Sequence, residues 1–173
     1  SKFYYKKPKN IIAVTGTNGK TSVADLYYQI LSLNNIPVAS IGTLGTKFKG
    51  KIINSDLTSP DIISLHQTLS KLKEKKIDNV IIEASSHGLH QKRLNNLNFK
   101  GGIFTNFSQD HLDYHKTMSS YLKAKLILFE RNEMSLYLID QELKNSLRES
   151  KLDIKLKSVL GSANKKDLLE KIF

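Results

Sequence analysis

The stretch NIIAVTGTNGKTSVADLYYQILSL, residues 10–33, decides the fold of this chain. Ile11–Val14 is a short apolar run, rich in β-branched residues, of the kind that forms a buried strand. A glycine-rich turn at Gly16–Thr21 follows, and apolar residues then recur at helical spacing as far as Leu33. A strand, a glycine-rich turn and a helix in this order are typical of a phosphate-binding loop, in which backbone N–H groups and the helix N-terminus surround phosphate oxygens.

Two side chains of this turn suit the chemistry of a nucleoside triphosphate. Lys20 can reach the β- and γ-phosphates, and the hydroxyl of Thr21 can bind Mg²⁺. The match is to the short pattern G-x-x-G-K-T, because Val14 stands where the longer pattern has its first glycine. The alternative is an ordinary strand-to-helix turn that contains a lysine, and the strand and helix on either side favour the phosphate loop.

The composition indicates one globular domain. Of the 173 residues, 39% are hydrophobic and 25% are charged, and no apolar run approaches the length that spans a membrane. Residues 1–9 contain no apolar segment of the kind found in a signal peptide, and the absence of cysteine excludes a disulfide scaffold. We therefore expect a cytoplasmic protein without membrane insertion.

The net charge of +11 admits two interpretations. One is binding to nucleic acid, and the other is a lysine-rich surface around a site for anionic substrates. The basic residues are spread over the chain, at residues 47–51, 71–76 and 151–166, and stacking aromatic residues do not alternate with them. We favour the anionic substrates and expect no nucleic acid as a partner.

The rest of the chain alternates strands with helices. This alternation predicts an α/β fold, a mostly parallel twisted sheet with flanking helices, whose ligands bind beyond the carboxyl ends of the strands. One helix is expected to start at Ser59 as its N-cap, with Pro60 as the first helical residue and Asp61 in the first turn. The other expected elements are strands at 38–41, 80–82, 103–107, 136–139 and 154–160, a hairpin or excursion at 42–53, and helices at 117–129, 142–149 and 167–172.

Polar residues follow two further strands. Glu83 comes directly after residues 80–82, and TNFSQDHLDYH, residues 105–115, ends the next strand. Because the carboxyl ends of parallel strands meet at one edge of a sheet, we expect these groups beside the phosphate loop, with Glu83 as a ligand of Mg²⁺ rather than a surface acid or a helix-cap partner. His111 and His115 have a spacing that zinc ligands use, but without cysteine or an H-E-x-x-H motif a polar loop is the better interpretation.

Four motifs in this order resemble the Mur ligases of peptidoglycan synthesis, and within that family the MurE branch of UDP-N-acetylmuramoyl-tripeptide synthetases. They are GTNGKT at 16–21, E-x-SSHGL-x-Q-x-R at 83–93, TN-x-S-x-DHLDYH at 105–115 and Y-x-x-AK-x-x-LF at 121–129. The first motif is shared with relatives such as folylpolyglutamate synthetase, whereas the second and third are much more specific to MurE. The resemblance covers roughly residues 10–140.

The resemblance implies roles for individual positions. Catalytic roles fall on Lys20, on His111 and on Lys125, which matches the family's carbamylated lysine; the alternative is a plain Lys125 paired with an acid or a phosphate. The implied ATP-binding residues are Gly16, Thr17, Asn18, Gly19, Lys20, Thr21, Ser22 and Asn106. The implied Mg²⁺ ligands are Thr21, Glu83 and His111, and the implied substrate-binding residues are Thr58, Ser59, Ser85, Gln91 and Arg93. Leu57 stands where related enzymes often have Asn, which puts one hydrogen bond to the substrate in doubt.

The resemblance also implies an activity and a domain organisation. The expected reaction is ATP-dependent amide bond formation through an acyl phosphate, which adds a diamino acid, meso-diaminopimelate or lysine, to UDP-N-acetylmuramoyl-L-alanyl-D-glutamate. Residues 1–9 would be a linker from a missing N-terminal domain, and residues 10–173 a central ATP-binding domain, truncated at its C-terminal end and without the C-terminal ligase domain. We expect a monomer that is inactive as a fragment. The alternatives are an isolated ATP-binding module without turnover and a ligase like folylpolyglutamate synthetase.

Overall fold

The computed structural model describes residues 6–54, 57–130, 134 and 136–139. The helices expected at 142–149 and 167–172 and the strand expected at 154–160 lie outside the described residues.

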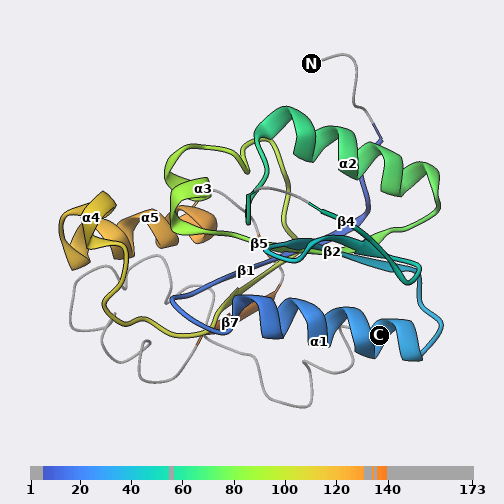
Figure 1. Cartoon of the computed structure of the whole chain (residues 1–173), viewed down its shortest axis with the longest axis horizontal. Helices are drawn as coiled ribbons and strands as arrows, with labels where there is room; N and C mark the ends of the chain where they lie inside the picture. Colours follow the sequence, from blue (N-terminus) through green and yellow to red (C-terminus); the bar gives the residue numbers. More distant parts are fainter. Residues whose placement is uncertain (1–5, 55–56, 131–133, 135, 140–173) are drawn as a thin grey trace.

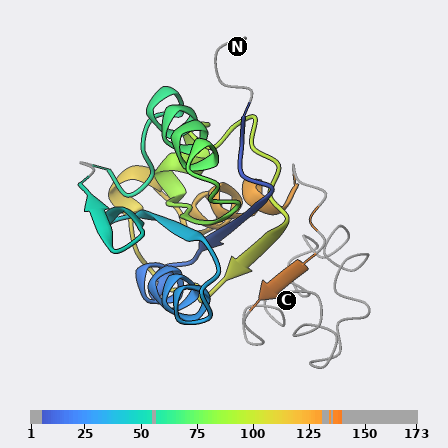
Figure 2. The ribbon, with the colours of Figure 1, turned by 90° about the vertical axis from the view of Figure 1, so that its right-hand side faces the viewer.

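A seven-stranded sheet forms the middle of the fold, with the strand order β4-β3-β2-β5-β1-β6-β7 (Figures 1 and 2). The five strands from β2 to β7 in this order are parallel, whereas β3 and β4 run antiparallel as a hairpin that extends one edge. This confirms the predicted α/β fold. The strands are β1 (Asn10–Thr15), β2 (Val38–Gly42), β3 (Gly45–Phe48), β4 (Lys51–Ile53), β5 (Asn79–Glu83), β6 (Gly101–Phe104) and β7 (Leu136–Ile139).

Helices cover both faces of the sheet, with α1 on one face and α2 and α3 on the other (Figure 1). Side chains of β1 point alternately to the two faces, so Ile11 and Ala13 join the large core that contains Leu69 of α2, whereas Val14 packs against Ala24 of α1. Burial on both faces explains the continuous apolar character of β1 and β5. The helices are α1 (Lys20–Leu33), α2 (Ile62–Glu74), α3 (Ser86–His90), α4 (Leu112–His115) and α5 (Met118–Glu130).

The predicted start of α2 is wrong. Asp61 is the N-cap, because its Oδ1 accepts hydrogen bonds from the backbone N–H groups of Ile63 at 2.9 Å and Ser64 at 3.0 Å. Ser59 Oγ instead donates to the carbonyl oxygen of Glu83 at 2.9 Å. A tertiary hydrogen bond thus uses the hydroxyl that the local pattern assigned to the cap.

The predicted bounds of β6 are also wrong, since the strand covers Gly101–Phe104 rather than 103–107. Its parallel pairing with β1 begins at Ile12 opposite Gly101 and ends at Thr15 opposite Phe104, so the two glycines, weak strand formers by themselves, belong to the sheet. The short helices α3 and α4 were not predicted, because four or five residues show no apolar period. The prediction is confirmed for the other described strands and for the hairpin. It is also confirmed for the cap near Thr117, whose hydroxyl accepts a hydrogen bond from the N–H of Ser120 at 3.1 Å.

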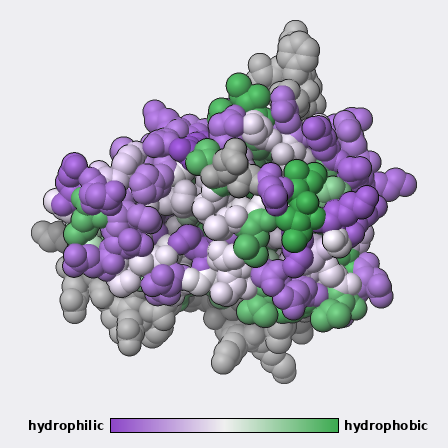
Figure 3. Space-filling model, in the orientation of Figure 1, coloured by the Kyte–Doolittle hydropathy of each residue, from purple (hydrophilic) through white to green (hydrophobic). Residues whose placement is uncertain are grey.

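Charged and polar residues cover most of the face seen in Figure 3, between smaller apolar patches. The described part of the chain contains no helix with the length and apolar character that crossing a bilayer requires. The polar residues of functional interest lie instead at the carboxyl ends of β1, β2, β5 and β6.

Candidate active site

The loop between β1 and α1 is held in an unusual backbone path. Gly16 has φ 144°, and a Cβ atom at this position would lie 1.9 Å from Thr105 Oγ1, so only glycine fits. The residues after β6 fix the loop from the other side: Thr17 N–H donates to the carbonyl of Asn106 at 3.0 Å, and Asn18 N–H donates to the Asn106 side chain at 2.9 Å. The loop is therefore pre-shaped by a second loop that lies far away in sequence.

Thr17 and Tyr121 strengthen this contact between the two loops. Thr17 Oγ1 donates to the carbonyl of Ser108 at 3.1 Å and accepts from the N–H of Ser108 at 3.0 Å. The buried Tyr121 hydroxyl of α5 lies 3.3 Å from the same oxygen and donates to it. Thr17 and Asn106 thus have clear roles within the protein, and their contacts with ATP stay predictions.

Two lysine side chains share one backbone oxygen at the phosphate loop. Lys20 Nζ donates to the carbonyls of Gly16 at 3.0 Å and Thr17 at 2.8 Å, and Lys125 Nζ donates to the same Gly16 carbonyl at 2.7 Å. Lys125 is only 1% exposed, and its amine lies 4.4 Å from the centre of the Tyr121 ring. We call Gly16–Thr21 together with Lys125 the phosphate side of the site.

Burial changes the protonation of both lysines. Desolvation, and after it the positive charge of Lys20, lower the pKa of Lys125 from 10.5 to about 7, while Asp110 opposes the shift. Desolvation also lowers the pKa of Lys20, against the raising effects of Glu83 and Asp110. A substantial fraction of the Lys125 amine is therefore neutral near pH 7 and can act as a nucleophile.

The carboxylate of Glu83 lies next to the phosphate side, against Thr21. Glu83 is 2% exposed, and its carboxylate accepts hydrogen bonds from the Thr21 hydroxyl at 2.9 Å, the Thr43 N–H at 3.1 Å and the Thr43 hydroxyl at 3.2 Å. Gly42 makes room for it, because a Cβ atom there would lie 2.0 Å from Glu83 Oε1. Sequence reasoning missed Thr43, although the parallel pairing of β2 with β5 predicts that the residue after β2 lies near Glu83.

The Thr21 hydroxyl and the Glu83 carboxylate fit a Mg²⁺ ion. Both are oxygen ligands, they lie 2.9 Å apart, and the carboxylate is buried next to the phosphate loop. No three His, Asp or Glu side chains in the described residues are grouped closely enough to hold a metal ion by themselves. Mg²⁺ commonly binds one or two carboxylates together with substrate phosphates and waters, so a hydroxyl and one carboxylate suit it as protein ligands.

His111 lines a cavity beside the phosphate loop and belongs to a cluster of aromatic rings. Its ring lies 5.0 Å from that of His87 and 6.0 Å from that of Tyr121, between ring centres, and its Nε2 lies 3.5 Å from Asp110 Oδ2. Burial, followed by the charge of His111, lowers the pKa of His87. The Nε2 atom of His115, in the same cluster, is buried and has no hydrogen-bond partner among the residues that the structure describes.

The predicted substrate-binding residues surround Ser59, which is itself 1% exposed. Ser59 Oγ lies 3.0 Å from Ser85 Oγ, and the Ser59 carbonyl accepts from Arg93 Nη1 at 3.0 Å. Gln91 is joined to Arg93 by a hydrogen bond from Nη2 and donates to the Tyr114 hydroxyl at 3.3 Å. We call Thr43, Thr58, Ser59 and Ser85 the acceptor side of the site.

The two sides meet in a cavity of about 280 Å³. Thr58 and Ser85 line it, whereas Gly16, Ser59, Gln91, Arg93 and Asn106 do not, and Glu83 reaches it through its hydrogen bonds to Thr21 and Thr43. The structure therefore brings together predicted residues from the ends of β1, β5 and β6, and it adds Thr43 from the end of β2. The lining residues are Thr17, Asn18, Gly19, Lys20, Thr21, Ser22, Thr43, Thr58, Ser85, Ser86, His111 and Lys125.

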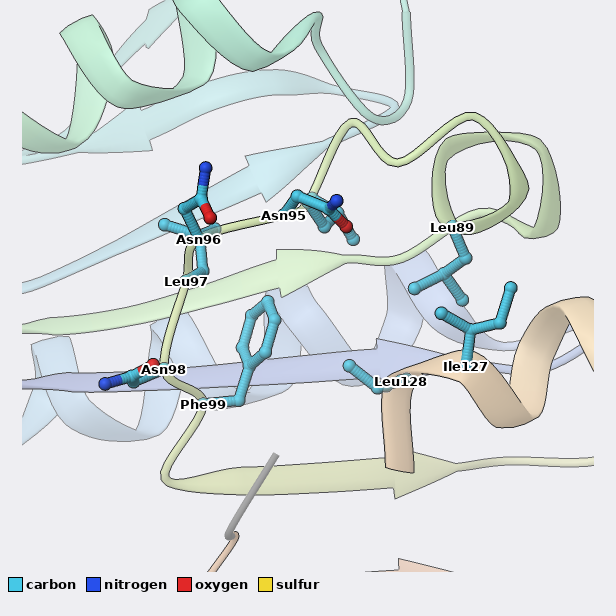
Figure 4. A pocket seen from close by; sticks show the side chains of 9 residues that line it. Leu89, Asn95, Asn96, Leu97, Asn98, Phe99, Ile127 and Leu128 are labelled. Carbon is cyan, nitrogen blue, oxygen red and sulfur yellow. The ribbon is translucent and has the colours of Figure 1, made fainter. Parts of the chain in front are cut away.

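A second cavity, of about 300 Å³, lies between the loop before β6 and α5 (Figure 4). Leu97 and Phe99 come from the loop, and Ile127 and Leu128 come from α5. Its lining contains asparagine amides but no charged side chain and none of the predicted site residues. The cavity between the phosphate and acceptor sides is therefore the candidate site.

The chain is similar to known proteins over most of its length. The sequence matches the Mur ligase middle domain over residues 14–172. It is 50% identical over 134 residues to the UDP-N-acetylmuramoyl-L-alanyl-D-glutamate--2,6-diaminopimelate ligase of Rickettsia felis, a match that covers 75% of this chain and 25% of the relative. The chain thus spans about a quarter of the length of this curated relative.

Solved structures give the same result at two levels of similarity. A structure of UDP-N-acetylmuramoyl-L-alanyl-D-glutamate--2,6-diaminopimelate ligase aligns with a TM-score of 0.72 at 33% identity, covering 83% of this chain and 30% of that chain. A bifunctional folylpolyglutamate synthase/dihydrofolate synthase with Mn, AMPPNP and L-glutamate bound aligns with a TM-score of 0.54 at 20% identity, covering 82% of this chain and 41% of that chain. The second likeness shows a shared fold alone. From its glycine-rich loop through most of its length, this chain belongs to the Mur ligase middle domain family.

Proposed function

We propose that the protein carrying this chain is an ATP-dependent ligase of peptidoglycan precursor synthesis, which joins 2,6-diaminopimelate to UDP-N-acetylmuramoyl-L-alanyl-D-glutamate. One observation carries the proposal: Lys20, Thr21 with Glu83, His111 and Lys125 converge on one cavity from separate segments of the chain. The names of the relatives, which share 50% and 33% of their aligned residues with this chain, supply the substrate.

The phosphate side is proposed to bind ATP. Its backbone N–H groups stand at the N-terminus of α1, and two lysine amines lie beside them, each bonded here only to backbone carbonyls among the described residues. Phosphate oxygens are stronger acceptors for these amines than the carbonyls, because they carry formal negative charge. Lys20 would accordingly move to the β- and γ-phosphates.

Thr21 and Glu83 would hold Mg²⁺, with His111 assigned as a further ligand by family resemblance. The ion supplies Lewis-acid neutralisation of the phosphate oxygens. Lys125, whose amine is partly neutral, is the residue that carbon dioxide would carbamylate, and the product would be a carboxylate in place of a cation. Plain Lys125 remains the alternative, in which its charge faces phosphate directly.

The proposed chemistry has two steps. An oxygen of the glutamyl carboxylate attacks the γ-phosphorus, the bond from that phosphorus to the bridging oxygen breaks, and ADP leaves. The amine of the incoming amino acid then attacks the acyl carbon, loses a proton and expels phosphate. Both partners of the first step are anions, so Lys20 lowers the barrier by stabilising the charge that collects on the transferred group.

Two alternatives are less well supported. A folylpolyglutamate synthetase-like ligase would share the fold, but such structures are only 20% identical to this chain, against 50% for the diaminopimelate ligase. An ATP-binding module without turnover describes the isolated fragment, which resembles the central domain of a larger enzyme. We further propose a cytoplasmic monomer that binds no nucleic acid, with residues 1–9 as a linker and residues 10–173 as an ATP-binding domain.

The test is substitution of Lys20 by Ala in the protein as its gene encodes it. Phosphate release in the presence of Mg-ATP, UDP-N-acetylmuramoyl-dipeptide and diaminopimelate should fall by about 100-fold or more, because a preorganised charge on the transferred phosphoryl group is lost. Lys71→Ala, which removes an exposed lysine from α2, is the matched control and should be normal. Near-normal turnover in Lys20→Ala would refute the proposal.

A further inference from the structure

Thr43, the residue after β2, stands between the carboxylate of Glu83 and the hydroxyl of Thr58, another member of the acceptor side. Its N–H donates to Glu83 Oε1 at 3.1 Å and its hydroxyl donates to Glu83 Oε2 at 3.2 Å. The same hydroxyl lies 3.1 Å from the hydroxyl of Thr58. No sequence motif pointed to Thr43, and it lines the cavity itself.

The direction of these hydrogen bonds follows from the chemistry of the acceptor. An ionised carboxylate can only accept, so the single hydroxyl proton of Thr43 goes to Glu83. The Thr43 oxygen is then an acceptor toward Thr58, whose own proton fills it. Thr58, Thr43 and Glu83 therefore form a chain of hydrogen bonds, in which Thr58 donates to Thr43 and Thr43 donates to Glu83.

Thr43 supplies most of the support that the carboxylate of Glu83 receives. Two of the three hydrogen bonds to this carboxylate in the described part of the chain come from Thr43, and the third comes from Thr21. Gly42 leaves the space that the carboxylate occupies, since a Cβ atom there would overlap it. Residues 42 and 43 therefore decide together where the carboxylate points.

We propose that Thr43 is a positioning residue that aims Glu83 at the cation and couples the cation to the occupant of the acceptor side. The inference rests on the proposed function, because it takes Glu83 as a metal ligand and Thr58 as a substrate contact. A substrate group that accepts a hydrogen bond from the Thr58 hydroxyl removes the hydrogen bond that Thr58 donates to the Thr43 oxygen. The hydrogen bond from Thr43 to Glu83 is altered as a result. Coupling of this kind is reciprocal, so each ligand changes the affinity of the other by the same factor.

Thr43→Val tests the positioning role, because valine keeps the shape and the N–H but loses the hydroxyl. Mn²⁺, as a paramagnetic probe for Mg²⁺, is titrated by electron paramagnetic resonance into the protein as encoded, with ATP present. Thr43→Val should weaken Mn²⁺ binding about tenfold, the scale on which partners of metal ligands act, and Thr43→Ser should stay within about twofold of wild type. Thr43 is exposed, so the substitution should not unfold the protein, and a circular dichroism melt checks this.

The coupling is measured in the same variants by titrating UDP-N-acetylmuramoyl-dipeptide with and without Mn²⁺. In wild type the cation should change the dipeptide affinity, and in Thr43→Val this change should disappear. Gly42→Ala gives an independent check, because displacing the carboxylate should weaken Mn²⁺ binding while the Thr43 hydroxyl is still present.

Wild-type Mn²⁺ affinity in Thr43→Val, or equal weakening in Thr43→Val and Thr43→Ser, would overturn the inference. Glu83→Gln separates this failure from failure of the proposed function. If Glu83→Gln loses Mn²⁺ while Thr43→Val does not, the metal site stands and the role of Thr43 falls. If Glu83→Gln binds Mn²⁺ normally, the metal assignment is wrong and the inference falls with it.

Discussion

The phosphate side and the acceptor side use opposite chemistry within one cavity. On the phosphate side, the amines of Lys20 and Lys125 are bonded to backbone carbonyls, and both donate to Gly16. On the acceptor side, hydroxyls are bonded to one another and to Glu83, as in the contacts of Thr43 with Thr58 and of Ser59 with Ser85. The phosphate side carries amine charge that its carbonyl partners do not neutralise. The hydroxyls of the acceptor side already have hydrogen-bond partners within the protein.

The phosphate side is therefore suited to attract anions, whereas the acceptor side is suited to hold a fixed geometry. The two desolvated amines share a single carbonyl and have no anionic hydrogen-bond partner among the described residues, so an incoming anion would stabilise their charged forms. A satisfied network of hydroxyls offers little charge but holds its geometry, because each member is fixed by a neighbour. We expect the phosphate side to govern turnover and charge, and the acceptor side to govern the placement of the substrate.

The largest effect should come from Lys125→Ala, which removes the buried amine of the phosphate side. Turnover of the encoded protein should fall by about 100-fold or more, because the proposed carbamate, which would help to hold Mg²⁺ at the transferred phosphoryl group, cannot form. Short carboxylic acids should restore part of the turnover by standing in for that carbamate. Lys123→Ala, two residues away and exposed, is the control and should be unaffected. Unchanged turnover without rescue would favour a plain Lys125 with no catalytic role.

The second effect is on stability, and its sign follows from the low pKa of Lys125. The unfolded chain holds the proton up to pH 10.5, whereas the folded protein releases it near pH 7, so the free energy of unfolding rises with pH between these values. This lysine contributes a slope of up to about 1.4 kcal/mol per pH unit. Urea unfolding in carbon dioxide-free buffer should show the slope in wild type and a smaller one in Lys125→Met; equal slopes would contradict the low pKa.

The smallest effect is expected next to the acceptor side, at the cap of α2. Asp61 lies two residues after Ser59 and accepts two backbone hydrogen bonds, so Asp61→Ala should cost about 1 kcal/mol in the free energy of unfolding. Asp61→Asn, which keeps a capping oxygen, should cost less. Nucleotide affinity should stay at the wild-type value in both variants. A change in nucleotide affinity would show that the two sides are not separable as described.

The parts of this site that could be predicted are those encoded locally. The phosphate loop lies next to its strand and helix, and Glu83 ends an apolar run, so the rule for parallel sheets was enough to place both at one edge. Thr43 follows β2 in a glycine-rich hairpin, where a threonine has no distinctive neighbours. Its role depends on the pairing of β2 with β5, which the sequence does not state.

The misplaced start of α2 has a similar origin. Ser59, Pro60 and Asp61 form a good local capping sequence, and which of the two polar residues caps the helix is decided by the carbonyl of Glu83, far away in the chain. The short helices α3 and α4 escaped prediction because their packing, rather than an apolar period, holds them. Prediction failed wherever a distant partner competed with a local one.

Gly42 contributes to the site only through its small size, and this restricts which substitutions are tolerated at residues 42 and 83. Any larger residue there would overlap the end of the Glu83 side chain, so replacement of Gly42 requires residue 83 to withdraw in the same lineage. Shortening residue 83 to aspartate would make room but would also pull the carboxylate back from Thr21. Natural variation at these two positions should therefore be inherited as a pair, and a survey that counts only ligand contacts would overlook one of them.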